Sequence, residues 1–155
     1  MDTINNLPAH ILFVHFVVVL IPVTAVFLIA CAVWRSLRNL LWWAAVVLSA
    51  GLIALTQLTQ DAGEWLQKQV PRSPAVNTHT ELGDTGLYIA IALFIASLLI
   101  AAVHWRERRT GRPKNGLVAL VAVLTIAIGV GSCAQIYRIG DSGAKAVWGD
   151  TVQAR

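Results

Sequence analysis

The chain has 155 residues, of which 57% are hydrophobic and 13% are charged, and its formal net charge is +4. An average soluble domain contains roughly 45–50% apolar and about 25% charged residues, so the composition argues against a water-soluble globular domain. The basic residues have no interleaved aromatic residues of the kind that stack on bases. This pattern argues against nucleic-acid binding and favours a membrane-topology signal and contact with lipid headgroups.

Four long apolar runs contain no Lys, Arg, Asp or Glu, at residues 11–34, 40–58, 85–105 and 116–137. A helix needs about 20 apolar residues to cross a hydrocarbon core of ~30 Å, and each run has about that length. The runs do not alternate as the strands of a membrane barrel do. We therefore predict one all-α membrane domain over residues 1–155, a four-transmembrane-helix bundle. Its helices are expected at about residues 8–34, 40–69, 79–105 and 116–137, followed by a short segment over 138–155.

The first predicted helix carries two of the four histidines near its start. Asn6 can cap this helix, and Pro8 suits its first turn because the N–H that proline lacks would be unpaired there anyway. His10 and His15 then fall in the first two turns. The segment before the helix contains Asp2 and no basic residue, so we expect the helix to stay as a span and not to be removed as a signal peptide.

Polar residues extend the second predicted helix beyond its apolar run to about residue 69. They recur at spacings of four, three and four, along one helical face, as Gln57, Asp61, Glu64 and Lys68. A loop with two prolines is expected to follow. The sequence over 78–81 then matches a capping box, which predicts the start of the third helix there. The glycines at 140 and 143 predict a turn after the fourth helix.

The charges predict how the chain is oriented, because Lys and Arg near helix ends are retained on the cytoplasmic side. The segments after the first and third helices contain seven basic residues and one acidic residue: Arg35, Arg38, Arg106, Arg108, Arg109, Arg112, Lys114 and Glu107. The remainder of the chain contains five basic and seven acidic residues. Both ends of the chain are therefore expected on the non-cytoplasmic side. Cys31 and Cys133 then lie near opposite faces, so no disulfide is expected.

With this topology, ionisable side chains from several helices meet at the non-cytoplasmic face. They include His10, His15, Asp61, Glu64 and His79, together with Gln57, Glu81, Asp84 and Gln135. An ionisable group inside a span usually faces the bundle interior or a watery cavity, and His15 is the one placed in an apolar stretch. We therefore expect His15 and His79 to hold a haem iron. As an alternative, His10, His15, Asp61 and His79 are candidate ligands of a transition metal.

Other interpretations of these residues stay open. Five residues turn a helix by roughly 500°, so His10 and His15 point about 140° apart and cannot both bind one ion from a regular helix. Each histidine could be a solvated or structural residue, and His15 could also have a proton-linked role. His104 is expected to be an interfacial residue. The chain has no nucleotide-binding, serine-hydrolase or zinc-protease motif and no CxxCH, so no enzyme signature and no catalytic residue is identified.

Short motifs along nearly the whole chain carry a family resemblance. They are Leu7-Pro8-Ala9-His10, His15-Phe16, Asp61, His79 and Ile136-Tyr137-Arg138-Ile139-Gly140. On these residues the chain resembles the bacterial domain-of-unknown-function 2231 family of small four-helix membrane proteins. The resemblance implies that His10, His15, Asp61, His79 and Arg138 are the positions to test, and it supplies no established cofactor. Ile11 and Val17 replace prolines that are usual in the family. Some relatives carry a Rieske iron–sulfur domain, which implies a place near electron transfer.

These observations lead to two main hypotheses about function. The first is a small multi-pass protein of the bacterial cytoplasmic (inner) membrane that binds haem b or a transition metal near the outer face. It would exchange electrons with quinone or a respiratory membrane complex. The second is a noncatalytic membrane partner or assembly protein whose His/Asp cluster is structural. A proton-linked carrier is a third hypothesis, but four short helices leave little cavity for a substrate unless the chain forms a homo-oligomer.

Overall fold

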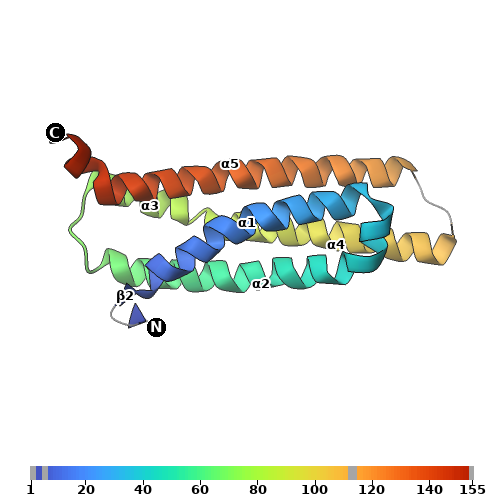
Figure 1. Cartoon of the computed structure of the whole chain (residues 1–155), viewed down its shortest axis with the longest axis horizontal. Helices are drawn as coiled ribbons and strands as arrows, with labels where there is room; N and C mark the ends of the chain where they lie inside the picture. The colour runs from blue at the N-terminus through green and yellow to red at the C-terminus, as the bar shows by residue number, and fades with distance from the viewer. Residues whose placement is uncertain (1–2, 5–6, 112–114, 154–155) are drawn as a thin grey trace.

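The computed structural model describes residues 3–4, 7–111 and 115–153, and these form an elongated bundle of helices (Figure 1). The elements in chain order are β1 (Thr3–Ile4), β2 (Leu7–Pro8), α1 (Ala9–Val33), α2 (Arg35–Gln67), α3 (Pro74–Gly83), α4 (Gly86–Thr110) and α5 (Asn115–Gln153). In the described part of the chain, four segments are long and apolar enough to cross a membrane: Ala9–Val33, Arg35–Gln67, Pro74–Thr110 and Asn115–Gly149. The prediction of an all-α bundle with four spans is confirmed.

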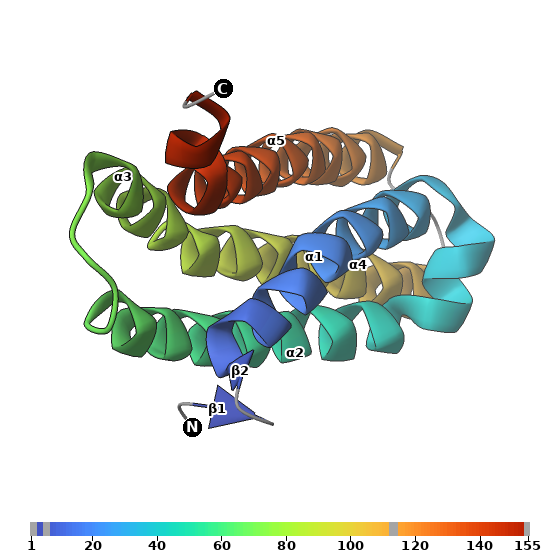
Figure 2. The same cartoon turned by 60° about the vertical axis from the view of Figure 1, so that its left-hand side comes forward.

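The helices run up and down along the long axis of the bundle. The central helix α1 packs against both α2 and α5, α4 packs against α2 and α5, and the short α3 packs mainly on the last turns of α5 (Figures 1 and 2). The start of α1 and the end of α5 therefore lie at the same end of the bundle (Figure 1). We call this the histidine end, after His10 and His79. The opposite end, with Arg35, Arg38 and the last turn of α4, is called the arginine end.

Aliphatic and small side chains fill the space between the helices. Ile21, Leu28 and Ile100 are fully buried, and the alanines at 45, 90 and 96 let the helix backbones approach closely. A hydrogen bond of 2.9 Å from Ser49 Oγ to Ser97 Oγ joins α2 to α4 inside this core. The outer surface is also apolar: large aliphatic residues such as Val26, Val47 and Val123 are more than 60% exposed. A soluble monomer rarely exposes apolar surface on this scale, whereas a bilayer would cover it.

The first part of the chain differs from the prediction in small ways. β1 and β2 form a two-residue antiparallel ladder in which Thr3 pairs with Pro8 and Ile4 with Leu7. α1 begins at Ala9 with Pro8 as its N-cap residue, while the predicted cap, Asn6, lies outside the described residues. α1 and α2 are joined by the single residue Trp34, so α2 begins five residues earlier than expected.

The predicted start of the third helix is wrong, because a better N-terminus precedes it. Ser73 is the N-cap residue of α3: its Oγ accepts a hydrogen bond from the Val76 N–H, and Pro74 occupies the first helical position. Thr78 is inside the helix, where its hydroxyl donates to the Pro74 carbonyl. Residues 74–77, which were expected in a loop, are therefore helical. The third span consists of α3 and α4 with a short break at Asp84 and Thr85.

The predicted end of the last helix is also wrong. α5 continues through Gly140 and Gly143 to Gln153, where the sequence indicated a turn. Glycine costs about 1 kcal/mol relative to alanine inside a helix, and tertiary contacts can outweigh that cost. Such contacts are present, because α3 packs along this part of α5. A local ion pair of 2.6 Å between Lys145 and Asp141, four residues apart in α5, adds to them. The segment over 138–155 is thus largely a continuation of α5.

Candidate functional site: two histidines at one end of the bundle

His10 and His79 face each other at the histidine end. Their ring centres are 6.3 Å apart, and the ring planes are inclined by 74°. His10 lies in the first turn of α1, and His79 lies in the middle of α3. Both side chains are partly buried. Two helices distant in the sequence therefore bring two imidazoles into one site.

The hydrogen bond of His10 determines which of its ring nitrogens is protonated. His10 Nδ1 lies 2.9 Å from the carbonyl oxygen of Thr59 in α2. A carbonyl oxygen only accepts, so Nδ1 must carry the proton and donate it. In the neutral imidazole, Nε2 then holds a lone pair. Gly63 makes room for this ring, because a Cβ at that position would lie 2.9 Å from His10 Nδ1.

His79 is held in the same tautomer by α5. Its Nδ1 lies 3.0 Å from Ser142 Oγ, and that hydroxyl donates its own hydrogen to the Ile139 carbonyl at 2.8 Å. With its one hydrogen assigned to the Ile139 carbonyl, the hydroxyl accepts from His79 Nδ1, and this assignment leaves the lone pair on Nε2. The ring lies against Gly143, where a Cβ would be 3.0 Å from His79 Cε1. Each of the two neighbouring imidazoles thus has a proton on Nδ1 and a lone pair on Nε2.

The other predicted site residues lie outside this pair. The structure does not bring His15 to His79: His15 is exposed, and its Nδ1 bonds to the Ile11 carbonyl in its own helix. Asp61 is exposed and accepts a 2.8 Å hydrogen bond from Gln57. Glu64 is also exposed, and the exposed Arg138 donates to Gln135 Oε1. Within the described residues, no three His, Cys, Asp or Glu side chains are grouped closely enough to hold a metal ion.

The arginine end contains a buried ion pair that the sequence analysis missed. Arg38 and Glu107 are 2% and 6% exposed, and Arg38 Nη2 lies 3.2 Å from both carboxylate oxygens. Arg38 Nη1 also donates to the carbonyls of Cys31 and Ala32, at 3.3 and 2.9 Å, at the C-terminus of α1. The guanidinium therefore joins α1, α2 and α4. Arg35 approaches the same carboxylate at 3.8 Å.

His104 is the second feature of this end, and it is buried where an interfacial histidine was expected. Its ring stacks on Trp42 with centres 5.4 Å apart, and its Nδ1 lies 3.1 Å from Asn39 Oδ1. A sequence signal for this cluster exists. Glu107 is the one acid among the basic residues there, and it follows His104 by three positions, which places both on one helical face. Cys31 is buried near this cluster, and both Cys31 and Cys133 are free thiols.

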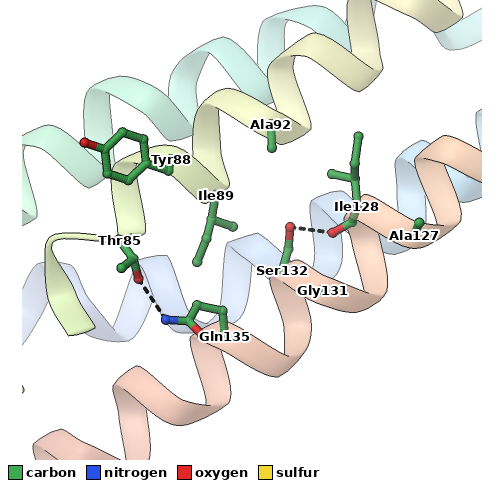
Figure 3. A pocket seen from close by; sticks show the side chains of 9 residues that line it. All are labelled: Thr85, Tyr88, Ile89, Ala92, Ala127, Ile128, Gly131, Ser132 and Gln135. Atoms are coloured by element: carbon green, nitrogen blue, oxygen red, sulfur yellow. Dashed lines mark hydrogen bonds between the residues drawn. The ribbon is translucent and has the colours of Figure 1, made fainter.

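A groove of about 440 Å³ runs between α4 and α5 in the half of the bundle nearer the histidine end (Figure 3). It is lined by Thr85, Tyr88, Ile89, Ala92, Ala127, Ile128, Gly131, Ser132 and Gln135. At its polar end Gln135 Nε2 donates to Thr85 Oγ1 at 2.9 Å, and the rest of its lining is largely apolar. Gly131 has open space where a Cβ would be, whereas Gly129 packs against Ile29 and Ala25 of α1.

The comparison with protein families identifies a relationship over almost the entire chain. Residues 6–155 match the family described as "Predicted membrane protein (DUF2231)". The chain therefore belongs to this family, and the predicted resemblance is confirmed. No curated protein and no solved structure matches the chain significantly.

Proposed function

We propose that this member of the DUF2231 family is a small redox-linked protein of the bacterial cytoplasmic membrane that holds a b-type haem through His10 and His79. One observation carries the proposal: two adjacent imidazoles each have Nδ1 engaged by an oxygen acceptor and Nε2 left with its lone pair. This is the usual state of a metal-binding histidine, whose second nitrogen is fixed by a hydrogen bond to protein. His10 takes the place that the sequence analysis gave to His15.

The number of ligands favours haem over a bare zinc ion. Structural zinc takes four ligands and catalytic zinc usually three from the protein, whereas the described residues bring two histidines together. The haem macrocycle supplies most of the nitrogens that its iron needs, so the two imidazoles of His10 and His79 would be sufficient to hold it. Their ring centres are 6.3 Å apart, which supports one group held by both.

When bound, the haem would supply one-electron transfer. The chain's own contribution is to orient the two imidazoles through Thr59 and Ser142 and to shield them with α1, α2, α3 and α5. Quinone is the proposed electron partner because it dissolves in the bilayer. The groove between α4 and α5, polar at Thr85 and Gln135 and apolar beyond them, supports access from the lipid side (Figure 3).

The orientation of the chain is part of the proposal. The excess of basic residues at the arginine end supports placing that end in the cytoplasm, with both chain ends and the histidine pair on the opposite side. A haem at this position would exchange electrons near the non-cytoplasmic face.

A noncatalytic membrane partner or assembly protein is the second candidate. A specific observation favours it: His10 ties α1 to α2 through Thr59, and His79 ties α3 to α5 through Ser142. These bonds would stabilise the bundle without any cofactor. On this view the pair is structural, as a satisfied polar pair between membrane helices often is.

Haem binding by single-histidine variants distinguishes the two candidates. The full-length protein is expressed with adequate haem supply, purified in mild detergent, and its haem content is measured by the pyridine haemochrome method. His10→Ala and His79→Ala should each remove most of the haem. His15→Ala, on the exposed face of the same helix as His10, and His104→Ala, at the arginine end, should retain it. Haem that survives in both His10→Ala and His79→Ala would refute the assignment of the ligands.

A further inference from the structure

A second cavity, of about 340 Å³, opens at the arginine end, far along the bundle from the histidine pair. It is lined by Asn39 and Trp42 from α2 and by His104, Trp105, Arg108 and Arg109 from α4. His104 is buried, so the cavity has one deeply placed polar side chain as well as two exposed guanidinium groups. None of these six residues belongs to the proposed haem site, so the cavity is a separate feature of the bundle.

The charge of this cavity is positive. No carboxylate is among its lining residues, and the nearest acid in the sequence, Glu107, is turned into the bundle and engaged by Arg38 and Arg35. In the part of the chain that the structure describes, the ion pairs do not include Arg108 or Arg109. The guanidinium of Arg109 lies 5.6 Å from the centre of the Trp105 ring, which positions it without neutralising it.

A neutral donor complements the two arginines. Asn39 Oδ1 accepts from His104 Nδ1, because an amide oxygen cannot donate, and this bond does not use the N–H groups of the Asn39 amide. Asn39 is one of the residues that line the cavity. Trp42 is stacked on His104 and is therefore held in place at the cavity wall. Two guanidinium groups, one amide and two indole rings thus line the same cavity.

We propose that this cavity binds the phosphate headgroup of an anionic membrane lipid. Arginine forks match the geometry of phosphate oxygens, and an adjacent amide can satisfy a third oxygen. The cavity lies where α2 begins and α4 ends, at the level of tryptophans, which favour the membrane interface. The cavity lies at the end of two spans, and Trp105 in its wall is partly exposed. Both features favour a phosphate that is attached to a lipid.

The test measures lipid affinity of the full-length protein in detergent by native mass spectrometry. Phosphatidylglycerol and phosphatidylcholine with identical acyl chains are titrated separately. Both contain the phosphodiester, but the first has a net negative charge, whereas the choline group of the second neutralises it. We expect phosphatidylglycerol to bind more tightly, and Arg108→Gln or Arg109→Gln each to weaken its binding about fivefold. Arg106→Gln is the matched control: it removes the same charge from the same exposed helix end, but Arg106 does not line the cavity.

Three outcomes would overturn the proposal. Equal affinity for the two lipids would show that the cavity does not distinguish an anionic lipid from a zwitterionic one. An equal loss in Arg106→Gln and Arg109→Gln would show diffuse attraction to a basic surface and no built site. Displacement of phosphatidylglycerol by millimolar inorganic phosphate would assign the cavity to a soluble phosphate compound. Haem content, measured on the same samples, reports separately on the histidine pair.

Discussion

The imidazole rings of His10 and His79 lie 6.3 Å apart, although each is held by a helix other than its own. Thr59 and Gly63 of α2 fix the ring of His10, and Ser142 and Gly143 of α5 fix that of His79. Four helices therefore meet at this pair. Replacing a residue that contacts one of these rings should therefore change the position of the ring although the histidine itself is unchanged.

The first prediction concerns Ser142, which accepts from His79 Nδ1. Ser142→Ala removes this acceptor and should lower haem affinity about 10–100-fold, since the partners of metal-binding histidines have effects of that size. The measurement is a haem titration of the purified apoprotein, followed by absorption. Ser132→Ala is the control, because Ser132 is also buried in α5 and donates to the carbonyl four residues before it, without contacting a histidine. Equal affinities for the two variants would contradict the assigned role of Ser142.

The second prediction concerns the close packing of Gly63 against His10. A Cβ there would lie 2.9 Å from His10 Nδ1, so Gly63→Ala should displace the ring, break its bond to the Thr59 carbonyl and reduce haem binding. Gly51→Ala, in the same helix, places its methyl group in open space and should leave haem binding unchanged. Haem binding is compared at equal protein concentration, and a fully haem-loaded Gly63→Ala protein would contradict the packing described for the pair.

The third prediction concerns stability and the ion pair at the arginine end. Glu107→Gln leaves the Arg38 guanidinium buried without its counter-charge and should reduce the free energy of unfolding by about 3–5 kcal/mol. The double variant Arg38→Met/Glu107→Leu should regain much of this loss, because it removes both charges together. The free energy of unfolding of the wild type and of both variants is measured by denaturant titration in detergent.

The control for this measurement is Asp141→Asn, which breaks the exposed ion pair with Lys145. Exposed pairs contribute little to stability, so this variant should unfold like the wild type. If Glu107→Gln also unfolded like the wild type, the carboxylate would not be compensating a buried charge.

The fourth prediction concerns the orientation of the chain. Cysteines are introduced at Asn77 in α3 and at Asn115 at the start of α5, in a background without Cys31 and Cys133; both asparagines are exposed, and they lie at opposite ends of the bundle. In intact cells a membrane-impermeant thiol reagent should label Asn77→Cys and spare Asn115→Cys, because the basic end is retained in the cytoplasm. Opening the cells should make both sites reactive. Labelling of Asn115→Cys alone would show that the chain has the opposite orientation.

The four spans could be predicted from the sequence, whereas several helix ends could not. An apolar run of about 20 residues is a sufficient signal for a span. The start of α3 depended on a competition between two caps, and Ser73 with Pro74 was preferred to the capping box over 78–81. The end of α5 depended on tertiary packing with α3, which outweighed two glycines. Local propensity cannot predict an outcome that contacts between distant segments decide.

The rotation of α1 explains why His10, and not His15, lies beside His79. His15 lies in an apolar stretch, and that was interpreted as a position inside the bundle. In a membrane helix the lipid-facing side is equally apolar, so hydrophobicity does not distinguish the two faces. His10 shares its face with Val17 and Ile21, which are seven and eleven residues later and are both buried. The interior position of His10 follows from this packing with α2 and α5.

The buried ion pair was missed for a related reason. Arg38 and Glu107 were assigned to turns because charged residues are costly inside a span. In the structure each compensates the charge of the other, which allows α2 to begin at Arg35 and α4 to continue to Thr110. A lone acid within a basic segment is therefore worth testing as the partner of a buried arginine.

The most direct test of the proposed function is the absorption spectrum of the wild-type protein, oxidised and then reduced with dithionite. The protein is purified in mild detergent from cells with adequate haem supply, and its metal content is measured on the same sample. We expect about one haem per chain and a sharp band on reduction, as given by a b-type haem with two histidine ligands. A colourless protein without metal would contradict the redox proposal and would leave His10 and His79 as a structural pair that fixes the helices.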